Sequence, residues 1–187
     1  MEGYYNFQRP TLANIHKQME AENKSFAEVV SMRLAWDRMR MDPTDIADIT
    51  GATYSYLMNG KSAEENTTFI AKKGERIRLR VVNASTMTFF DVRVPGLPMT
   101  VVQTDGQNIK PVETDEFRIG VAETYDVIVT PKEERPYTLF AETMDRSGFV
   151  RGTLAPQVGM SAPIPERRQR PMLTMADMGM MHHEGMD

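Results

Sequence analysis

The stretch that most constrains the fold is Gly74–Asn83, in which basic and apolar residues alternate. Arginine occupies every second position from 76 to 80, and aliphatic residues fill the positions between and after them. Successive side chains of an extended chain point to opposite faces of a sheet. The alternation therefore predicts a β-strand with one solvated face and one buried face.

The whole region from 52 to 155 consists of short apolar or alternating runs separated by turn residues. Asn59-Gly60, Pro95-Gly96 and Asp105-Gly106 are turn dipeptides of this kind. Helical patterns do not alternate with the runs, which disfavours a parallel α/β fold. Many short strands at this spacing predict an antiparallel sandwich or barrel. The other predicted strands are Tyr54–Met58, Thr67–Ala71, Phe89–Val94, Met99–Gln103, Glu116–Ile119, Tyr125–Val129 and Tyr137–Glu142.

Residues 11–49, ahead of the strands, have the three- and four-residue apolar spacing of helices. Ser25 followed by Glu28 is a capping-box pattern, which predicts a helix that begins after Ser25. Asp42-Pro43 interrupts the apolar pattern and predicts a short third helix over 43–49, with Asp42 as its N-cap. We therefore expect a helical arm in front of the strand region.

Cysteine is absent, and His16 is the one histidine outside the last six residues. This composition excludes disulfides, thiol catalysis, zinc–thiolate sites and the cysteine ligand of a blue-copper centre. The sequence has no phosphate-binding glycine loop, nucleophile elbow or metalloprotease helix. A net charge of −4, without a basic patch interleaved with aromatic residues, gives no reason to expect nucleic-acid binding.

No apolar run approaches the roughly 18 residues that span a bilayer, so we expect no membrane span. The first ten residues lack the basic and apolar segments of a signal peptide. Two alternatives follow: the protein is cytoplasmic, or the chain lacks its true N-terminus.

The C-terminal tail, residues 175–187, combines methionine and histidine with acidic residues and glycine. Thioether sulfur suits Cu(I), and imidazole suits copper in either oxidation state. Acidic residues and glycines interrupt any apolar face, which argues against a buried helix; the alternative is a passive spacer. The predicted copper ligands are Met175, Met178, Met180, Met181, His182, His183 and Met186.

Residues 157–174 contain three prolines and a basic run, Arg167–Arg170, and resemble an extended linker. We expect the basic run to be solvated, with an acidic partner as the alternative. The chain thus divides into a helical arm or linker over 1–50, a β-sandwich over 51–156, a Pro/Arg-rich linker over 157–174 and a Met/His-rich tail over 175–187.

Five segments of the strand region have a recognisable combined pattern: Gly74–Asn83, Phe90–Val94, Met99–Gly106, Lys110–Val112 and Glu123–Val129. Together they resemble the middle cupredoxin domain of the three-domain multicopper oxidases. The flanking segments are similar to the copper-resistance subfamily, usually called CopA or PcoA. These segments are Tyr4–Phe7, Met41–Gly60, Thr143–Gly148, Arg151–Pro156 and Leu173–Met180.

This resemblance implies a mainly β fold, a cupredoxin-like Greek-key β-sandwich with an N-terminal helical arm. In that family the outer two domains supply the copper ligands, through His-x-His, His-x-x-His-x-His and His-Cys-His motifs. None of these motifs is present in this sequence. The resemblance therefore implies no catalytic or cofactor-binding residue in this chain.

The implied parent is a periplasmic, copper-dependent oxidoreductase that oxidises cuprous ions or phenols. Its middle domain is non-catalytic, and the expected partners are copper ions and the flanking cupredoxin domains of the same parent. Two alternative functions remain open at this point: a free-standing Cu(I)-binding module, and a metal-free interaction domain.

Overall fold

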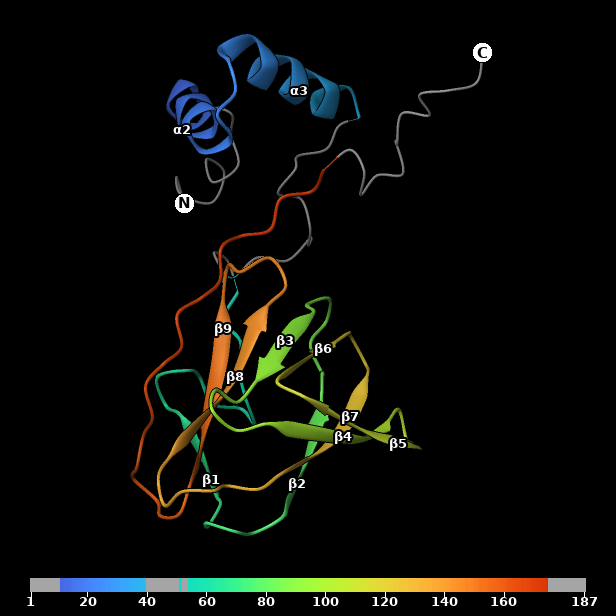
Figure 1. Ribbon diagram of the computed structural model, residues 1–187, viewed down its shortest axis with the longest axis vertical. Helices are drawn as coiled ribbons and strands as arrows, with labels where there is room; N and C mark the ends of the chain where they lie inside the picture. The colour runs from blue at the N-terminus through green and yellow to red at the C-terminus, as the bar shows by residue number, and fades with distance from the viewer. Residues whose placement is uncertain (1–10, 40–50, 52–53, 175–187) are drawn as a thin grey trace. The chain divides into compact units, whose positions relative to one another are not determined.

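A computed structural model describes residues 11–39, 51 and 54–174 of the protein (Figure 1). These residues form a pair of helices and a β-sandwich, which are described separately below. The predicted third helix over 43–49 and the Met/His tail over 175–187 lie outside the described residues.

The helical unit contains α2 (Leu12–Glu22) and α3 (Phe26–Arg38). The Ser25 hydroxyl accepts a hydrogen bond from the Glu28 N–H, and the Glu28 carboxylate accepts one from the Ser25 N–H. This reciprocal pair confirms the predicted capping box, which satisfies two N–H groups that the first turn of a helix leaves without partners.

The two helices are joined by a hydrogen bond from the Arg33 Nε to the Gln18 Oε1 at 2.9 Å. Val29 and Trp36 of α3 are buried, whereas Leu34 is more than half exposed. Neither α2 nor α3 has the length and hydropathy of a membrane-spanning helix, and these are the helices in the part of the chain that the structure describes.

The strand region forms two packed sheets, which confirms the predicted sandwich (Figure 1). One sheet has the strand order β1-β9-β8-β3-β6 and the other the order β2-β7-β4-β5. Among the described strands, β1 and β9 pair in parallel and the other neighbours pair antiparallel. The strands are β1 (Thr67–Ile70), β2 (Ile77–Val82), β3 (Phe90–Arg93), β4 (Met99–Thr104), β5 (Gln107–Thr114), β6 (Glu116–Ile119), β7 (Thr124–Val129), β8 (Tyr137–Thr143) and β9 (Phe149–Ala155).

The hydrophobic core consists of alternate side chains from the facing sides of the two sheets. Val127 and Val129 of β7 and Leu154 of β9 are almost fully buried in it. In β2, Ile77, Leu79 and Val81 pack against this core, while Arg78 and Arg80 are exposed. The basic–apolar alternation in the sequence therefore correctly predicted both faces of this strand.

The predicted strand Tyr54–Met58 is not a strand in the structure. Met58 instead makes an isolated bridge to Lys61, which closes the predicted turn at Asn59-Gly60. Both turn residues have positive φ, 51° and 79°, as a tight turn between antiparallel segments requires.

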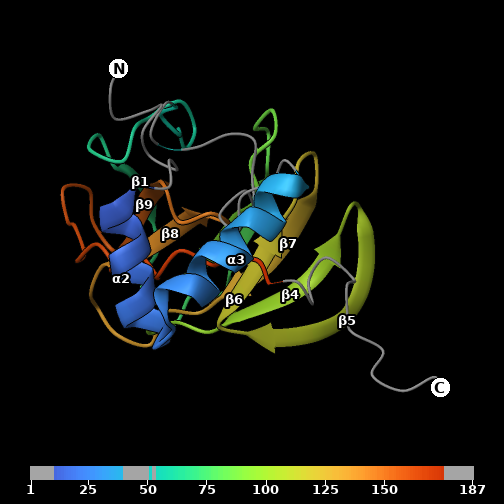
Figure 2. The same ribbon diagram turned by 90° about the horizontal axis from the view of Figure 1, so that it is seen from above.

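Two strands, β5 and β9, were not predicted, because each contains a residue that is unfavourable in a strand. β5 contains Pro111, which is tolerated because β5 is an edge strand and projects from the sandwich beside β4 (Figure 2). β9 contains Gly152, and a Cβ there would lie 2.8 Å from the Phe69 ring and 3.0 Å from the Thr67 carbonyl oxygen. Glycine at this position lets β1 approach β9.

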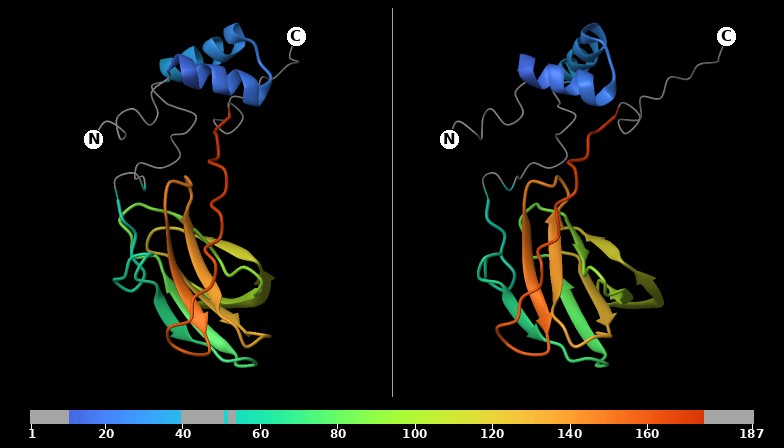
Figure 3. Two further views of the ribbon diagram at one scale, coloured as in Figure 1. Left: turned by 90° about the vertical axis from the view of Figure 1, so that its left-hand side faces the viewer. Right: turned by 60° about the vertical axis from the view of Figure 1, so that its left-hand side comes forward.

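β8 is buried along its whole length, on both of its faces. Tyr137, Leu139 and Ala141 point into the core, and side chains of the opposite face are also buried, with Thr138 at 3% exposed and Glu142 at 0%. The chain after β9 returns along the five-stranded sheet (Figure 3), and it contacts both of these outward-facing residues. This return segment contributes side chains and an N–H group to the polar cluster described next.

Candidate functional site

The structure does not describe the predicted copper ligands. All of them lie in the tail outside the described residues: Met175, Met178, Met180, Met181, His182, His183 and Met186. Within residues 11–39, 51 and 54–174, no group of three or more His, Cys, Asp or Glu side chains is placed to hold a metal ion. Because the chain also lacks cysteine, the donors of the sandwich do not fit a catalytic copper centre.

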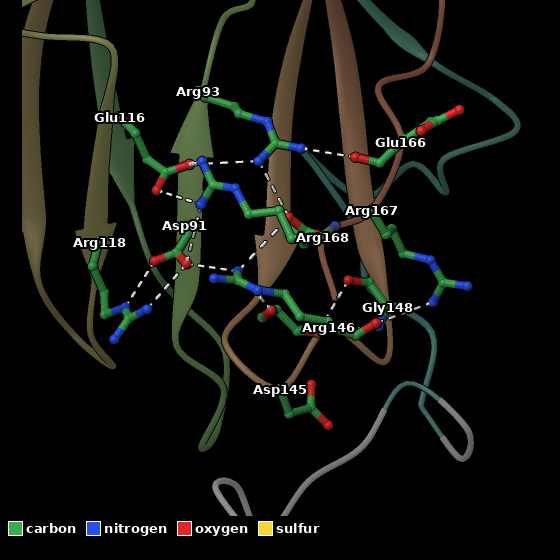
Figure 4. Close-up of polar contacts among 12 residues, drawn as sticks. Asp91, Arg93, Glu116, Arg118, Asp145, Arg146, Gly148, Glu166, Arg167 and Arg168 are labelled. Atoms are coloured by element: carbon green, nitrogen blue, oxygen red, sulfur yellow. Dashed lines mark hydrogen bonds and ion pairs between the residues drawn. The ribbon is translucent and has the colours of Figure 1, made fainter. Parts of the chain in front are cut away.

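A carboxylate cluster lies on the outer face of the five-stranded sheet (Figure 4). Asp91 of β3 and Glu142 of β8 are direct cross-strand partners, and their side chains are only 3% and 0% exposed. Glu116 of neighbouring β6 is also near this cluster. Like charges opposite each other destabilise a sheet unless they are compensated, so this face requires cations.

Arginine side chains supply these cations. Arg118 binds Asp91 in a two-pronged geometry, with Nε at 2.7 Å and Nη2 at 3.0 Å from the two carboxylate oxygens. Arg146, from the turn after β8, lies 2.6 Å from the same carboxylate, and Arg93 lies 3.3 Å from Glu142. Each buried carboxylate therefore has at least one arginine partner, which is the condition for keeping a charge out of water.

The arginines set the protonation of Asp91. Burial alone would raise the pKa of this carboxyl, but the hydrogen bonds from Arg118 and Arg146 outweigh burial and hold the pKa below its usual value. The sequence pattern does not indicate which residues are the partners of Asp91. The available signal for a charged outer face on β3 was a charged residue at every second position, Asp91 and then Arg93.

We expect the stability of the unchanged chain to depend on pH in acid differently from that of an Asp91→Asn variant. The carboxyl ionises near pH 3.9 in the unfolded chain, and its pKa is lower in the folded protein. Its ionised form therefore stabilises the fold above about pH 4, and this contribution is lost as the pH falls through the folded-state pKa. In urea titrations we expect the difference in unfolding free energy between the two proteins to be constant above about pH 5 and to shrink below about pH 4. A difference that grows in acid would contradict the assignment.

Residues 163–168, here called the strap, cross this charged face after β9. The Thr138 hydroxyl donates to the Pro163 carbonyl at 2.8 Å, and the Arg93 guanidinium donates to the Glu166 carbonyl at 3.1 Å. The N–H of Arg168 donates to the Glu142 carboxylate at 2.8 Å. The strap is therefore attached to β8 and β3 at points along its length.

The first two arginines of the basic run, Arg167 and Arg168, bind the sandwich as well as solvent, so the expectation that this run is merely solvated is incomplete for both. The Arg168 guanidinium donates to Glu116 at 2.6 Å, and the Arg167 guanidinium donates to the Ser147 carbonyl at 2.7 Å (Figure 4). Both side chains keep contact with solvent. Their partners lie on strands and turns distant in sequence, which is why composition suggested free charges.

An apolar groove lies between β2 and the segment 54–60, away from the charged outer face. Its volume is about 780 Å³. Phe90 and Leu139 of the core form part of its lining, and its edge includes Tyr54, Leu57 and Val82, which are 54%, 59% and 61% exposed. Exposed apolar surface around a groove is typical of a region that another protein part covers.

Comparison with known sequences gives a consistent match along nearly the whole chain. The family described as "Multicopper oxidase" matches residues 30–157. "Copper resistance protein A" from Escherichia coli is 52% identical over 188 residues, covering 98% of this chain and 31% of that protein. The protein of the same name from Pseudomonas syringae pv. tomato is 50% identical over 186 residues, covering 98% of this chain and 30% of that protein. The chain thus spans about a third of the length of these relatives.

Among solved structures, the sandwich is similar to that of Fet3p, described as a multicopper oxidase that functions in iron import. The TM-score is 0.51 at 18% sequence identity, and the match covers 62% of this chain and 24% of that chain. A likeness at this identity concerns the fold alone. The architecture is therefore the mainly β, cupredoxin-like sandwich that the sequence motifs implied, with helices at the N-terminal side.

Proposed function

This chain belongs to the multicopper oxidase family, and we propose that it acts as a non-catalytic middle domain of a longer copper-resistance oxidase. The observation that carries the proposal is the donor set. The chain has no cysteine and a single histidine outside its tail, whereas a blue-copper site requires one cysteine and two histidines. Copper is the cofactor of the family, and in the proposed parent the other domains would supply its catalytic ligands.

The structural part of the proposed role is to pack against flanking cupredoxin domains of the same parent. The apolar groove between β2 and the segment 54–60 supports this part, because large apolar side chains such as Leu57 and Val82 are exposed at its edge. The relatives also extend well beyond the matched region, which accounts for 30–31% of their length. Another domain of the parent could cover the groove.

The second part of the proposal concerns the tail. Five methionines and two histidines lie within thirteen residues, and these soft and borderline donors suit Cu(I). We propose that the tail collects Cu(I) for a parent that oxidises cuprous ions or phenols. We also propose a periplasmic location, on the basis of the resemblance to the copper-resistance subfamily.

The test of the non-catalytic role is an oxidase assay on the purified chain after loading with copper. We expect no catalytic oxidation of cuprous ions or phenols, and no blue colour, because the thiolate ligand that produces a blue-copper centre is absent. The control is the longer parent under identical loading, which should show both. Multi-electron oxidation by the isolated chain would overturn the proposal.

A further inference from the structure

We infer that the strap is a positioning element that fixes where the Met/His tail leaves the sandwich and so limits how far the tail reaches. The inference rests on the proposed copper binding by the tail, but its structural basis is independent of it. The tail begins seven residues after Arg168 and twenty residues after Ala155, the last residue of β9.

The sheet has a buried carboxylate that the strap is needed to satisfy. Glu142 is 0% exposed, and the hydrogen bond to its Oε1 comes from the backbone N–H of Arg168 at 2.8 Å. The other carboxylate oxygen has ion-pair contacts with Arg93 at 3.3 Å and with Arg146 at 3.7 Å. A buried carboxylate that loses a hydrogen bond is costly, so the docked strap is the favoured state.

Anchors at both ends of the strap hold it against the sheet. At one end, the buried Thr138 hydroxyl binds the Pro163 carbonyl. At the other end, Arg168 pairs with Glu116 as well as with Glu142. The exposed ion pair contributes little by itself, because solvent screens it. The charge-assisted bond to buried Glu142 is the stronger contact.

This attachment shortens the tether of the tail. An extended chain spans at most about 3.5 Å per residue, so Met175 can lie no more than about 25 Å from a fixed Arg168. If the strap were free, the tether would start at Ala155 and could extend to about 70 Å. The docked strap therefore reduces the maximum reach of the first proposed donor, Met175, from about 70 Å to about 25 Å.

The absence of cysteine makes a direct test possible, because two cysteines can be introduced for spin labels and no native cysteine will be labelled as well. We would label Gln169→Cys at the end of the strap and Lys132→Cys in the loop between β7 and β8, both exposed positions of the full chain. Pulsed electron resonance without copper then gives the distribution of distances between the labels. For the otherwise unchanged chain we expect one narrow distribution.

The releasing variant is Arg168→Pro, which removes the N–H donor and the guanidinium in one change. Adding Thr138→Val and Arg167→Ala removes the bonds to the Pro163 carbonyl and the Ser147 carbonyl, so that of the contacts described above only the hydrogen bond from Arg93 to the Glu166 carbonyl is left. We expect the distribution to broaden toward that of a free segment of fourteen residues, whose end-to-end distance has a root-mean-square value of about 20 Å. Val158→Pro is the matched control, because Val158 is 80% exposed and precedes Gly159, where φ is +88° and the turn tolerates proline.

A broad distribution in the unchanged chain, or a narrow one that persists in the variant that combines Arg168→Pro, Thr138→Val and Arg167→Ala, would overturn the inference. The proposed function is tested separately, by Cu(I) titration of the full chain and of a chain that ends at Thr174. If the distances behave as expected but the tail binds no copper, the positioning role of the strap is supported and the proposed copper role of the tail is wrong. If the tail binds copper but the distance distribution of the unchanged chain is broad, the positioning role is wrong and the copper role is supported.

Discussion

Replacing Asp91 by asparagine should lower the free energy of unfolding by about 3 kcal/mol, because removing one partner of a buried ion pair leaves the others uncompensated. The Asp91 side chain is 3% exposed, and its partner Arg146 is only 10% exposed. We place the effect at the lower end of the usual 3–5 kcal/mol range, since Arg118, at 52% exposed, remains hydrated when its partner is lost. Urea denaturation at neutral pH gives the measurement.

The matched control for this variant is Glu133→Gln, which also removes one carboxylate charge. Glu133 pairs with Arg135 at 2.6 Å, but its side chain is 64% exposed. Exposed pairs contribute about 0–1 kcal/mol, so this variant should be nearly as stable as the parent chain. If the two variants lose equal stability, the buried cluster is not the feature that stabilises the outer face of the sheet.

Removal of the tail should abolish Cu(I) binding. In an anaerobic titration against a chromogenic Cu(I) chelator, we expect the full chain to withdraw copper and the chain that ends at Thr174 to withdraw none. Changing the five tail methionines to leucine should weaken binding by more than about tenfold, or about 1.4 kcal/mol, because leucine keeps the volume but lacks the sulfur donor. The variant carries leucine at Met175, Met178, Met180, Met181 and Met186.

The control for the tail is the same substitution at Met87 and Met172, which are both 47% exposed in the described part of the chain. Their replacement by leucine should leave the titration unchanged. His182 and His183 should add affinity at neutral pH and lose it below about pH 6.5, where imidazole is protonated. Equal copper withdrawal by the full and shortened chains would rule out the tail as a metal site and leave it as a spacer.

Most of the strands could be predicted because their signals are local. The alternation in β2 and the turn dipeptide Asp105-Gly106 depend on neighbouring residues only, and the structure has a strand and a turn at these positions. The strand predicted over Tyr54–Met58 was wrong, since an alternating pattern does not guarantee a neighbouring strand with which to pair. β5 and β9 were missed because Pro111 and Gly152 are acceptable only at an edge or beside a close neighbour.

The carboxylate cluster and the strap could not be predicted from such signals. Asp91 and Glu142 are far apart in sequence and become cross-strand partners only through the pairing of β3 with β8. The basic run looked solvated because the carboxylates that Arg168 binds are distant from it in sequence. Its partner Glu116 is fifty-two residues away from Arg168.

The sequence by itself determined the class of the molecule. Alternation and turn residues indicated a sandwich, the missing cysteine excluded a blue-copper centre in this chain, and the motifs indicated the multicopper oxidase family. Only the tertiary structure decided which charges meet, and that the chain after β9 lies bound across β8 rather than free. The physical reason is that periodicity and composition are local properties, whereas the compensation of a buried carboxylate depends on which distant strands and segments the fold brings within hydrogen-bonding distance.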